Sequence, residues 1–402
     1  MSLAELSAKA DSYVATLCSV KPNRRTGSPG NREATEFFAN TMHSLGYEVD
    51  ASPFDALDYI DEGSVLTVGM DNYEVFTSPY SEACDVRAEL VVASSIETLE
   101  IAECKEKVLL MIGDLCAEQL MPKNFVFYNP EHHQKMISLL ERKAPAAIIA
   151  ATTRSPEQVG ALYPFPLIVD GDFDIPSVYC REAIGAKLAG YQGYQVGVEI
   201  RTRRIPSSAT NIIATLNPGM PRKIVLTAHI DAYEDSPGAS DNASGTAVLL
   251  LAGEILSDYR GENSIEIAAL NGEDHFSAGG QMDYLNRYRR EFPSITLAVN
   301  IDDVGYRKGR SAYSFYDCSE ELGGKAEDAF KDFDGLCRGE PWFSGDHMIF
   351  VQNKVPAIAI TAEQMPELMK TVTHTSEDTP DLLDYRKLVV VAELLNKLVR
   401  TL

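Results

Sequence analysis

Histidine and carboxylate side chains stand directly after short apolar segments in the second half of the chain. Three of these segments, Lys223–Thr227, Ser264–Leu270 and Leu297–Ile301, have the length and composition of buried strands. In an open α/β sheet the ligand crevice lies beyond the carboxyl ends of the strands, so we expect the loops that follow them to meet there. The groups that could carry chemistry in these loops are His229, Asp231, Asp241, Glu273, Asp274, Asp302, Asp303 and His374.

Imidazole and carboxylate groups without a thiolate suit a catalytic zinc site that keeps one position open for water. Two histidines and three carboxylates can hold two metal ions if one carboxylate bridges them. Paired metals ~3.5–4 Å apart stabilise the attacking and leaving oxygens and lower the pKa of bound water. A further carboxylate nearby can take the proton of that water. The pattern therefore indicates metal-assisted hydrolysis, with zinc as the expected metal and manganese or cobalt as alternatives.

Each of these groups also has a structural explanation. His229 and Asp231 could form an ordinary hydrogen-bonded pair, and Asp241 could cap the helix that follows it. Glu273 and Asp274 could lie in a solvated loop of an acidic protein, and the two aspartates after the third segment could simply end a strand. Their joint position after several strands favours a metal site over these alternatives.

From about Pro206 onward, apolar strands alternate with helices. This alternation predicts an α/β fold with a doubly wound, mostly parallel sheet flanked by helices. The expected strands are Lys223–Thr227, Ser264–Leu270, Leu297–Ile301 and Ala357–Ile360, and the expected helices lie near Ser244–Leu256, Ala278–Tyr288, Glu320–Phe330 and Asp381–Leu402.

The remainder of the chain consists of two parts with different sequence patterns. Within residues 1–60, Glu33–Leu45 carries the one-sided apolar stripe of a helix. Residues 61–203 contain short β-rich runs separated by Gly, Pro and Asp, with one helix near Glu131–Arg142. We therefore predict that residues 1–60 and 204–402 form one domain, whose second part carries the metal site. Residues 61–203 form a smaller β-rich inserted domain, and a length of 402 residues suits such a two-domain chain.

Composition argues against several classes of partner. The chain has 36 Lys and Arg against 59 Asp and Glu, a formal charge of −23, so phosphate backbones would repel it and we expect no nucleic acid partner. Its apolar runs are shorter than the roughly 20 residues that span a bilayer, so we expect no membrane partner. Seven cysteines without a C-x-x-C pair, together with the lack of a secretory signal, favour a cytoplasmic location. Secretion stays open if a leader has been removed, and the oligomeric state is not predicted.

The motifs around these residues resemble those of the di-zinc exopeptidases of metallopeptidase family 28, which include aminopeptidases and glutamate carboxypeptidase-like enzymes. The segment that ends in Asp174–Val178 is similar to the protease-associated domain that is often inserted in these peptidases. The stretches that carry the family resemblance are Arg25–Asn31, His229–Gly245, Gly272–Asp274, Val299–Asp302, Ser344–His347 and His374–Thr379.

The resemblance implies a zinc exopeptidase fold and a role for each site residue. Two zinc ions per chain would be bound, one by His229 and Asp302 and the other by Asp274 and His374, with Asp241 bridging them. Glu273 would be the general base that activates the bridging water and then protonates the leaving amine. Asp231 would orient His229 through its second ring nitrogen. The substrate would be a peptide, most simply one that loses its N-terminal residue.

Three departures from the family pattern bear on this assignment. Asp274 stands where relatives more often carry Glu, a ligand that is one methylene longer. Asp303 follows Asp302 where an apolar residue is usual; the register through Asn300 and Gly305 favours Asp302 as the ligand, with Asp303 as the alternative. Thr373 precedes the last histidine, where several relatives place a Tyr that helps to bind the tetrahedral intermediate.

Two other functions stay open. A carboxypeptidase or dipeptidase would use the same di-zinc chemistry and would recognise the substrate carboxylate with Arg side chains, for which Arg307 and Arg310 are candidates. A non-catalytic binding protein on a degenerate peptidase fold would normally have lost ligands, whereas every ligand position here holds a competent side chain.

The remaining histidines and the lone tryptophan carry weaker expectations. His347 is expected near the site in a structural role, and His275 either lines the crevice or is solvated. Trp342 and Phe343 either form a pocket wall or belong to the core. The other histidines, on predicted helices, are expected to be solvated: His43, His132 and His133.

Overall fold

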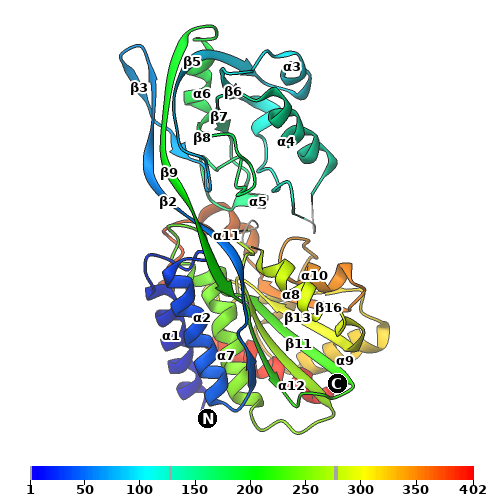
Figure 1. Ribbon diagram of the computed structural model, residues 1–402. Helices are drawn as coiled ribbons and strands as arrows, with labels where there is room; N and C mark the ends of the chain where they lie inside the picture. Colours follow the sequence, from blue (N-terminus) through cyan, green and yellow to red (C-terminus); the bar gives the residue numbers. More distant parts are fainter. Residues whose placement is uncertain (1, 126–128, 276–278) are drawn as a thin grey trace. The chain divides into compact units, whose positions relative to one another are not determined.

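The computed structural model describes residues 2–125, 129–275 and 279–402. The chain divides into two compact units, one made of Met1–Ala56 and Ser208–Leu402 and the other of Leu57–Ser207 (Figure 1). The predicted insertion, residues 61–203, lies inside the second of these units. The first unit contains every residue predicted to bind metal.

The first unit is built on an eight-stranded sheet whose four central strands are parallel. The strand order is β1-β10-β12-β11-β13-β16-β14-β15, and the parallel neighbours are β12, β11, β13 and β16. The central strands are buried on both faces, which explains their nearly continuous apolar sequences. The strand bounds are β1 Glu48–Asp50, β10 Ile212–Leu216, β11 Arg222–His229, β12 Asn263–Leu270, β13 Ile295–Ile301, β14 Ser311–Tyr316, β15 Leu336–Arg338 and β16 Ala357–Ala362.

Helices cover both faces of this sheet (Figure 1). On one face, alternate strand residues such as Leu226 and Val299 join a large apolar cluster with α1, α2, α7, α9 and α12. On the other face, α8 packs against β12, and α10 packs against β13 and β16. The helix bounds are α1 Leu3–Ser19, α2 Pro29–Ser44, α7 Gly245–Leu256, α8 Gly280–Tyr288, α9 Glu320–Phe330, α10 His347–Gln352, α11 Met365–Thr371 and α12 Tyr385–Thr401.

The predicted fold class, a mostly parallel sheet flanked by helices with a smaller insertion, is confirmed. The start of the predicted helix Ala278–Tyr288 lies outside the described residues. The last helix begins at Tyr385 rather than at Asp381, because Asp384 caps it by accepting a hydrogen bond from the backbone N–H of Arg386. In the described parts of the chain, no helix is both long and apolar enough to cross a membrane.

The second unit has its own eight-stranded sheet, in the order β3-β2-β9-β5-β6-β7-β8-β4. Its central strands β5 to β8 are parallel, and alternate residues face opposite layers. Leu109 and Met111 of β6 join the cluster that contains residues of α4, whereas Val108 and Leu110 join the cluster that contains Leu188 of α6. The bounds are β2 Pro53–Val68, β3 Asp71–Tyr73, β4 Phe76–Thr77, β5 Cys84–Ala93, α3 Ile96–Ile101, β6 Val108–Met111, α4 Glu131–Lys143, β7 Ala147–Thr152, α5 Pro156–Val159, β8 Ser177–Arg181, α6 Glu182–Ala189 and β9 Gln195–Thr210.

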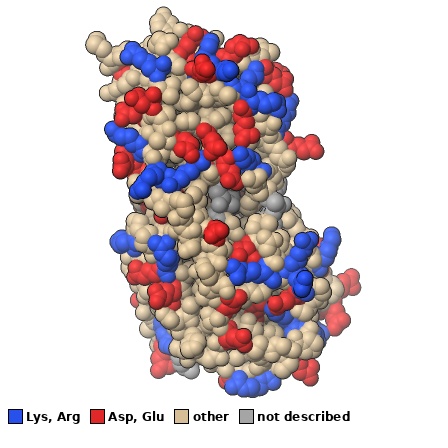
Figure 2. All heavy atoms as spheres, viewed as in Figure 1, with Lys and Arg blue, Asp and Glu red and all other residues tan. Residues whose placement is uncertain are grey.

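The excess of acidic residues does not collect in one place on the face drawn in Figure 2. Acidic and basic side chains alternate there on the surfaces of both units. Many of them form exposed pairs, such as Lys325 with Glu321 at 2.8 Å. Pairs of this kind contribute at most about 1 kcal/mol each.

A buried polar network lies on the α8 face of the first sheet. Glu266, in the middle of β12, is 1% exposed and accepts hydrogen bonds from Lys223 Nζ and from the hydroxyl of Tyr284, each at 2.5 Å. Lys223 also pairs with Glu291 at 2.5 Å. A charged group in such a position is tolerated only while its partners remain.

We therefore expect Lys223→Met to lower the free energy of unfolding by about 3 kcal/mol, because it leaves the Glu266 carboxylate buried without a cation. The double variant Lys223→Met with Glu266→Leu should regain most of that loss, since no buried charge is left unpaired. Chemical denaturation of four proteins, the wild type, Lys223→Met, Glu266→Leu and the double variant, measures this. Losses that simply add in the double variant would contradict the proposed coupling.

Candidate metal centre

The predicted metal ligands converge at the carboxyl ends of adjacent strands. His229 is the last residue of β11, while Asp274 and Asp302 follow β12 and β13, the two neighbours of β11 in the sheet. Asp241 lies in the turn before α7, and His374 follows α11. This is the position at which parallel α/β sheets bind ligands, because the connecting loops diverge there.

Asp241 lies between the two histidines. Its Oδ1 is 3.0 Å from His229 Nε2, and its Oδ2 is 3.1 Å from His374 Nε2. The same nitrogen of His374 lies 2.9 Å from Asp274 Oδ1, and that of His229 lies 3.4 Å from Asp302 Oδ1. The five side chains therefore form two imidazole–carboxylate pairs that share a central carboxylate.

The donor set fits a pair of cations. Ligand atoms of His229, Asp241 and Asp274 all lie within 4.8 Å of one another, and the three residues are buried. Within the described chain, Oδ2 of Asp274 and Oδ1 of Asp302 are buried and make no hydrogen bond. Buried carboxylate oxygens that point into one small volume need positive charge, and nitrogen and oxygen donors of this kind suit zinc.

The electrostatics of the two histidines point the same way. Burial lowers the pKa of His229, but Asp302 and Asp241 together raise it well above its ordinary value. Burial likewise lowers the pKa of His374, and Asp274 with Asp241 raises it well above the usual range. The surrounding carboxylates therefore create a strongly negative potential at both Nε2 atoms, which is where a bound cation would lie.

Asp231 contacts two of the residues that form the ligand cluster. It is fully buried, its Oδ1 lies 3.6 Å from His229 Nδ1, and its Oδ2 accepts a hydrogen bond from the backbone N–H of Asp274 at 3.2 Å. Asp231 thus faces the ring nitrogen of His229 that points away from Asp241, and it also ties down the loop that carries Asp274. This geometry suits the orienting role predicted for it.

Glu273 precedes Asp274 in the same loop and is partly buried. Burial and the charges of Asp274 and Asp302 raise the pKa of Glu273 well above its ordinary value. Asp346 adds a further negative charge nearby, and Gln281 donates a hydrogen bond to Asp346 at 2.6 Å. Glu273 therefore lies beside the ligand cluster, and among the described residues it forms no ion pair or hydrogen bond with His229 or His374.

The two consecutive aspartates have different positions. Asp302 faces His229, as described above, whereas Asp303 accepts a hydrogen bond from Ser240 Oγ at 2.8 Å. Asp303 adopts a left-handed backbone conformation, with φ of 53°, which turns its side chain toward the Asp241 loop. Of the two, the structure brings Asp302 into the cluster.

Two buried residues that we did not predict as site residues shape the loop between β11 and α7. Arg24 is 2% exposed and donates hydrogen bonds to the carbonyls of Ile230 at 3.0 Å and of Gly238 at 2.7 Å. Asp378 accepts hydrogen bonds from the backbone N–H groups of Ser240 at 2.8 Å and of Asp241 at 3.0 Å. These bonds fix the backbone that presents Asp241. Arg24 directly precedes the Arg25–Asn31 motif, and Asp378 lies within the His374–Thr379 motif.

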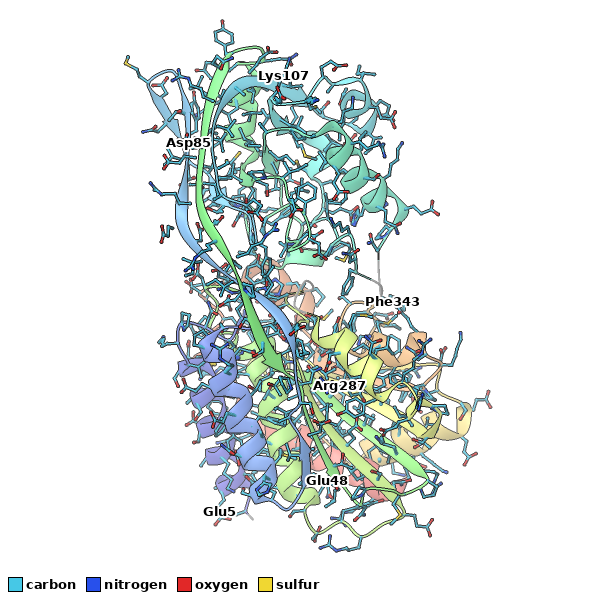
Figure 3. The ribbon with its side chains drawn as sticks, viewed as in Figure 1. Glu5, Glu48, Asp85, Lys107, Arg287 and Phe343 are labelled. Atoms are coloured by element: carbon cyan, nitrogen blue, oxygen red, sulfur yellow. The ribbon has the colours of Figure 1, made fainter. Side chains whose placement is uncertain are left out.

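The other predicted residues are placed as follows. His275 and His347 are both buried, so neither is solvated. Their Nε2 atoms lie close to the carbonyl oxygens of Ala232 at 3.3 Å and of Trp342 at 3.0 Å. Phe343 is 71% exposed and therefore is not core (Figure 3), whereas the Trp342 ring packs edge-on against His347 at 4.6 Å.

The two arginines considered for carboxylate recognition have other partners. Arg310 pairs with Glu363 at 2.9 Å, and Arg307 donates a hydrogen bond to the carbonyl of Leu383 at 3.1 Å. Thr373, which replaces a family Tyr, is 2% exposed, so its hydroxyl is shielded from solvent.

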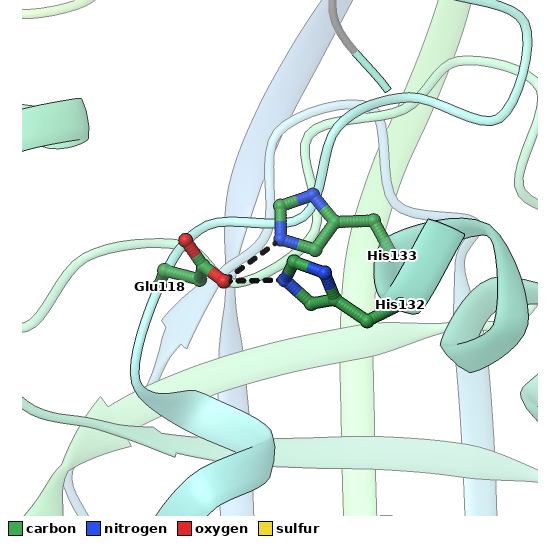
Figure 4. A group of neighbouring side chains, drawn as sticks. All are labelled: Glu118, His132 and His133. Carbon is green, nitrogen blue, oxygen red and sulfur yellow. Dashed lines mark hydrogen bonds and ion pairs between the residues drawn. The ribbon is translucent and has the colours of Figure 1, made fainter. Parts of the chain in front are cut away.

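A second histidine–carboxylate group lies in the other unit (Figure 4). Glu118 Oε1 is 2.7 Å from His132 Nε2 and 3.1 Å from His133 Nε2. The expectation that His133 is solvated is wrong, because it is fully buried against the loop before α4. His133 Nδ1 accepts the backbone N–H of Met121 at 3.2 Å, so the proton of the neutral ring lies on Nε2, which is 3.1 Å from Glu118 Oε1. A histidine that binds a metal uses one unprotonated ring nitrogen and normally donates a hydrogen bond from the other. His133 uses its unprotonated Nδ1 to accept the Met121 N–H, so it has no nitrogen left for a metal. We therefore describe Glu118, His132 and His133 as a polar latch rather than as a set of metal ligands.

The stability that the latch contributes depends on pH, and the pKa of His133 determines the direction of that dependence. Burial lowers the pKa of His133 below its ordinary value of 6.5, and Glu118 only partly offsets this. The stability that neutral His133 contributes is therefore present above pH 6.5 and is lost as the pH falls through its lowered pKa in the folded state. Amide hydrogen exchange in α4, expressed relative to the intrinsic exchange rate at each pH, should therefore accelerate over that range in the wild type.

The variant His133→Asn keeps an acceptor for the Met121 N–H but does not titrate, so the acceleration should largely disappear. His132→Asn, which leaves the bond between Met121 and His133 in place, is the matched control. An undiminished pH dependence in His133→Asn would contradict this assignment.

Comparison with known proteins agrees with the geometry. The model of peptidase family M28 matches residues 211–399, a range that contains all five predicted ligands. The probable lipoprotein aminopeptidase LpqL of Mycobacterium tuberculosis is 25% identical over 74% of this chain and 58% of its own length. Aminopeptidase Y of Saccharomyces cerevisiae is 23% identical over 85% of this chain and 66% of its own length. The chain thus spans somewhat more than half of the length of these curated relatives.

Solved structures show the same fold. The zinc aminopeptidase BSAP from Bacillus subtilis superposes with a TM-score of 0.76 at 19% identity, over 98% of this chain and 94% of that one. An aminopeptidase from Aneurinibacillus sp. strain AM-1 has a TM-score of 0.74 at 20% identity, over 98% and 93%. The predicted resemblance is confirmed: residues 211–399 match the model of peptidase family M28, and the chain has the fold of these zinc aminopeptidases.

Proposed function

We propose that this chain is a zinc-dependent aminopeptidase that removes N-terminal residues from peptides. The observation that carries the proposal is the position of Asp241, with one carboxylate oxygen about 3 Å from each of two buried imidazoles. Each imidazole has a further carboxylate partner of its own, which is the arrangement that two neighbouring metal ions require.

Two zinc ions per chain would be held by these residues. His229 and Asp302 would bind one ion, His374 and Asp274 the other, and Asp241 would bridge them. When bound, such a pair polarises a substrate carbonyl and lowers the pKa of a shared water molecule. Asp231 would keep His229 in the orientation that directs Nε2 toward the ion.

Glu273 would act as the general base. It is the carboxylate next to Asp274, and within the described residues it pairs with neither histidine of the cluster, so it is available to hold a proton. Its Oε atom would accept a proton from the attacking water and then deliver it to the nitrogen of the leaving amine. A carboxylate whose pKa is raised by burial serves both steps, because the same group must gain and lose the proton.

The arginine side chains bear on whether the substrate loses its N-terminal or its C-terminal residue. A carboxypeptidase needs a cationic side chain for the terminal carboxylate of its substrate. Arg307 and Arg310 are engaged with Leu383 and Glu363, so neither is held ready for a substrate. The names of the relatives reported above, aminopeptidases from bacteria and yeast, favour removal from the N-terminus.

The second unit would be an inserted domain of the protease-associated type. This proposal rests on the segment that ends in Asp174–Val178 and on the insertion of Leu57–Ser207 between two parts of the peptidase unit.

The test compares two substrates that differ only in the amine. Leucine p-nitroanilide and its N-acetyl derivative are incubated with zinc-loaded protein, with and without a chelator. We expect turnover of the free amine alone, loss of turnover with the chelator and recovery with added zinc. Turnover of N-blocked peptides with a free carboxyl end, but not of leucine p-nitroanilide, would instead support a carboxypeptidase. Metal binding below stoichiometry and no turnover would support a non-catalytic binding protein.

A further inference from the structure

Three aromatic rings lie nearly parallel at the edge of the candidate metal centre. Tyr233 follows β11 in the loop toward Asp241 and is 9% exposed. Its ring centroid lies 4.7 Å from that of His374, with an interplanar angle of 21°, and 5.7 Å from that of His275, with an angle of 18°. The His374 ring is therefore stacked on a tyrosine through one of its faces.

The two candidate ligand histidines differ in how their rings are oriented. His229 has the Asp231 carboxylate 3.6 Å from its Nδ1. Nδ1 of each ring is buried and makes no hydrogen bond within the described chain, but His374 has no counterpart to Asp231, since its ion pairs with described residues involve Nε2 alone. Metal-binding histidines almost always donate a hydrogen bond from the second nitrogen, so His374 needs another means of orientation.

The backbone at His374 makes this need greater. His374 adopts a left-handed conformation, with φ of 68°, which a residue with a side chain rarely takes. The ring thus projects from an uncommon backbone geometry, and rotation about its side-chain bonds would move Nε2 away from Asp241 and Asp274. The stack on Tyr233 opposes that rotation, since parallel aromatic rings lose contact area when one of them turns.

Tyr233 is itself held in place by its neighbours. Its carbonyl accepts a hydrogen bond from the backbone N–H of Ser236 at 3.2 Å. The preceding carbonyl of Ala232 lies 3.3 Å from His275 Nε2, and Arg24 binds the carbonyl of Ile230. A ring anchored on this loop can fix the orientation of a second ring packed on it.

We propose that Tyr233 is a positioning residue that holds the imidazole of His374 in the plane required for metal binding, in the place of the hydrogen bond that His374 lacks. This inference rests on the proposed function, because it takes His374 to be a ligand. The electron-rich face of the phenol ring also favours an imidazole that carries part of the charge of a bound cation. Tyr233 acts through His374 and is not itself assigned a step in the reaction.

The test measures zinc affinity rather than turnover. Metal-free wild type, Tyr233→Leu and Tyr233→Phe are titrated with zinc in competition with a chromogenic chelator. We expect Tyr233→Leu to retain one tight site and to bind the second ion about tenfold more weakly, as is typical when the support of a ligand is removed. Tyr233→Phe keeps the ring and should match the wild type at both sites.

Thermal unfolding of the metal-free proteins separates positioning from folding. If Tyr233→Leu does not fold, Tyr233→Met, with a flexible side chain that fills space without a ring, takes its place. Equal zinc affinities in the wild type and in a folded variant without the ring would overturn the inference, and so would an equal loss in Tyr233→Phe. A wild type that binds no zinc would overturn the proposed function, and this inference with it.

Discussion

Glu273→Gln is expected to lower kcat on leucine p-nitroanilide by about 10³-fold while zinc content and stability remain those of the wild type. Glutamine has nearly the same size as glutamate and keeps a polar side chain at the position directly before Asp274. It cannot accept a proton, however, and the transfer of a proton by a positioned base contributes roughly 10²- to 10⁴-fold to the rate.

The control for this variant is Glu262→Gln, which makes the same chemical change at a side chain that is 90% exposed. Its activity should equal that of the wild type. Elemental analysis and thermal unfolding of Glu273→Gln complete the comparison. If the variant keeps its zinc and retains more than a tenth of the wild-type kcat, Glu273 is not the base.

Asp241→Asn is expected to reduce the zinc content from two ions to one or fewer per chain and to lower kcat/KM on the order of 10³-fold. The carboxylate of Asp241 offers one oxygen to each side of the centre, 3.0 Å from His229 Nε2 and 3.1 Å from His374 Nε2. A carboxamide has a single acceptor oxygen and no charge, so it cannot bridge. Loss of several kcal/mol of transition-state stabilisation corresponds to a rate change of this size.

Asp235→Asn is the matched control, because Asp235 is exposed and lies on the same loop between β11 and α7. It should leave zinc content and activity unchanged. Full zinc content in Asp241→Asn would show that Asp241 does not bridge and that the two pairs bind independently.

The strands and the loops that carry the ligands could be predicted from sequence because their signals are local. The apolar segments that became β11, β12 and β13 are nearly continuous, as buried parallel strands must be. His229, Asp274 and Asp302 follow directly after them, and the rule that ligands gather at the carboxyl ends of parallel strands then brings them together. The helix at Glu320–Phe330 could also be predicted from local signals, because Ser319 caps it and its apolar residues share one face.

What could not be predicted depends on contacts between residues far apart in the chain. The motif register favoured Asp302 over Asp303 as the ligand but left Asp303 open, and the hydrogen bond from Ser240 shows that Asp303 turns toward a different loop. The hydrogen bond from Arg24 to the Gly238 carbonyl joins residues that are 214 positions apart in the sequence. The stack of Tyr233 on His374 likewise joins two loops that follow different strands.

The insertion shows the same limit. Its short apolar runs predicted short strands, whereas β2 and β9 each extend over 16 residues. The length of these two strands could not be predicted, because their exposed and buried positions do not alternate cleanly. His133 lies on a predicted helix and was expected to be solvated, but it is buried, with the Met121 N–H bonded to its Nδ1 and the Glu118 carboxylate 3.1 Å from its Nε2. Burial of a histidine with two partners carries no signature in the sequence around it.

The most direct test of the proposed centre is a zinc titration of the metal-free wild type, with binding and turnover of leucine p-nitroanilide followed together. The arrangement of Asp241 between two imidazole–carboxylate pairs predicts that binding saturates at two zinc ions per chain. It also predicts that full activity is reached only when both are bound. Saturation at one ion with full activity, or no binding at all, would contradict a two-metal centre built from these five residues.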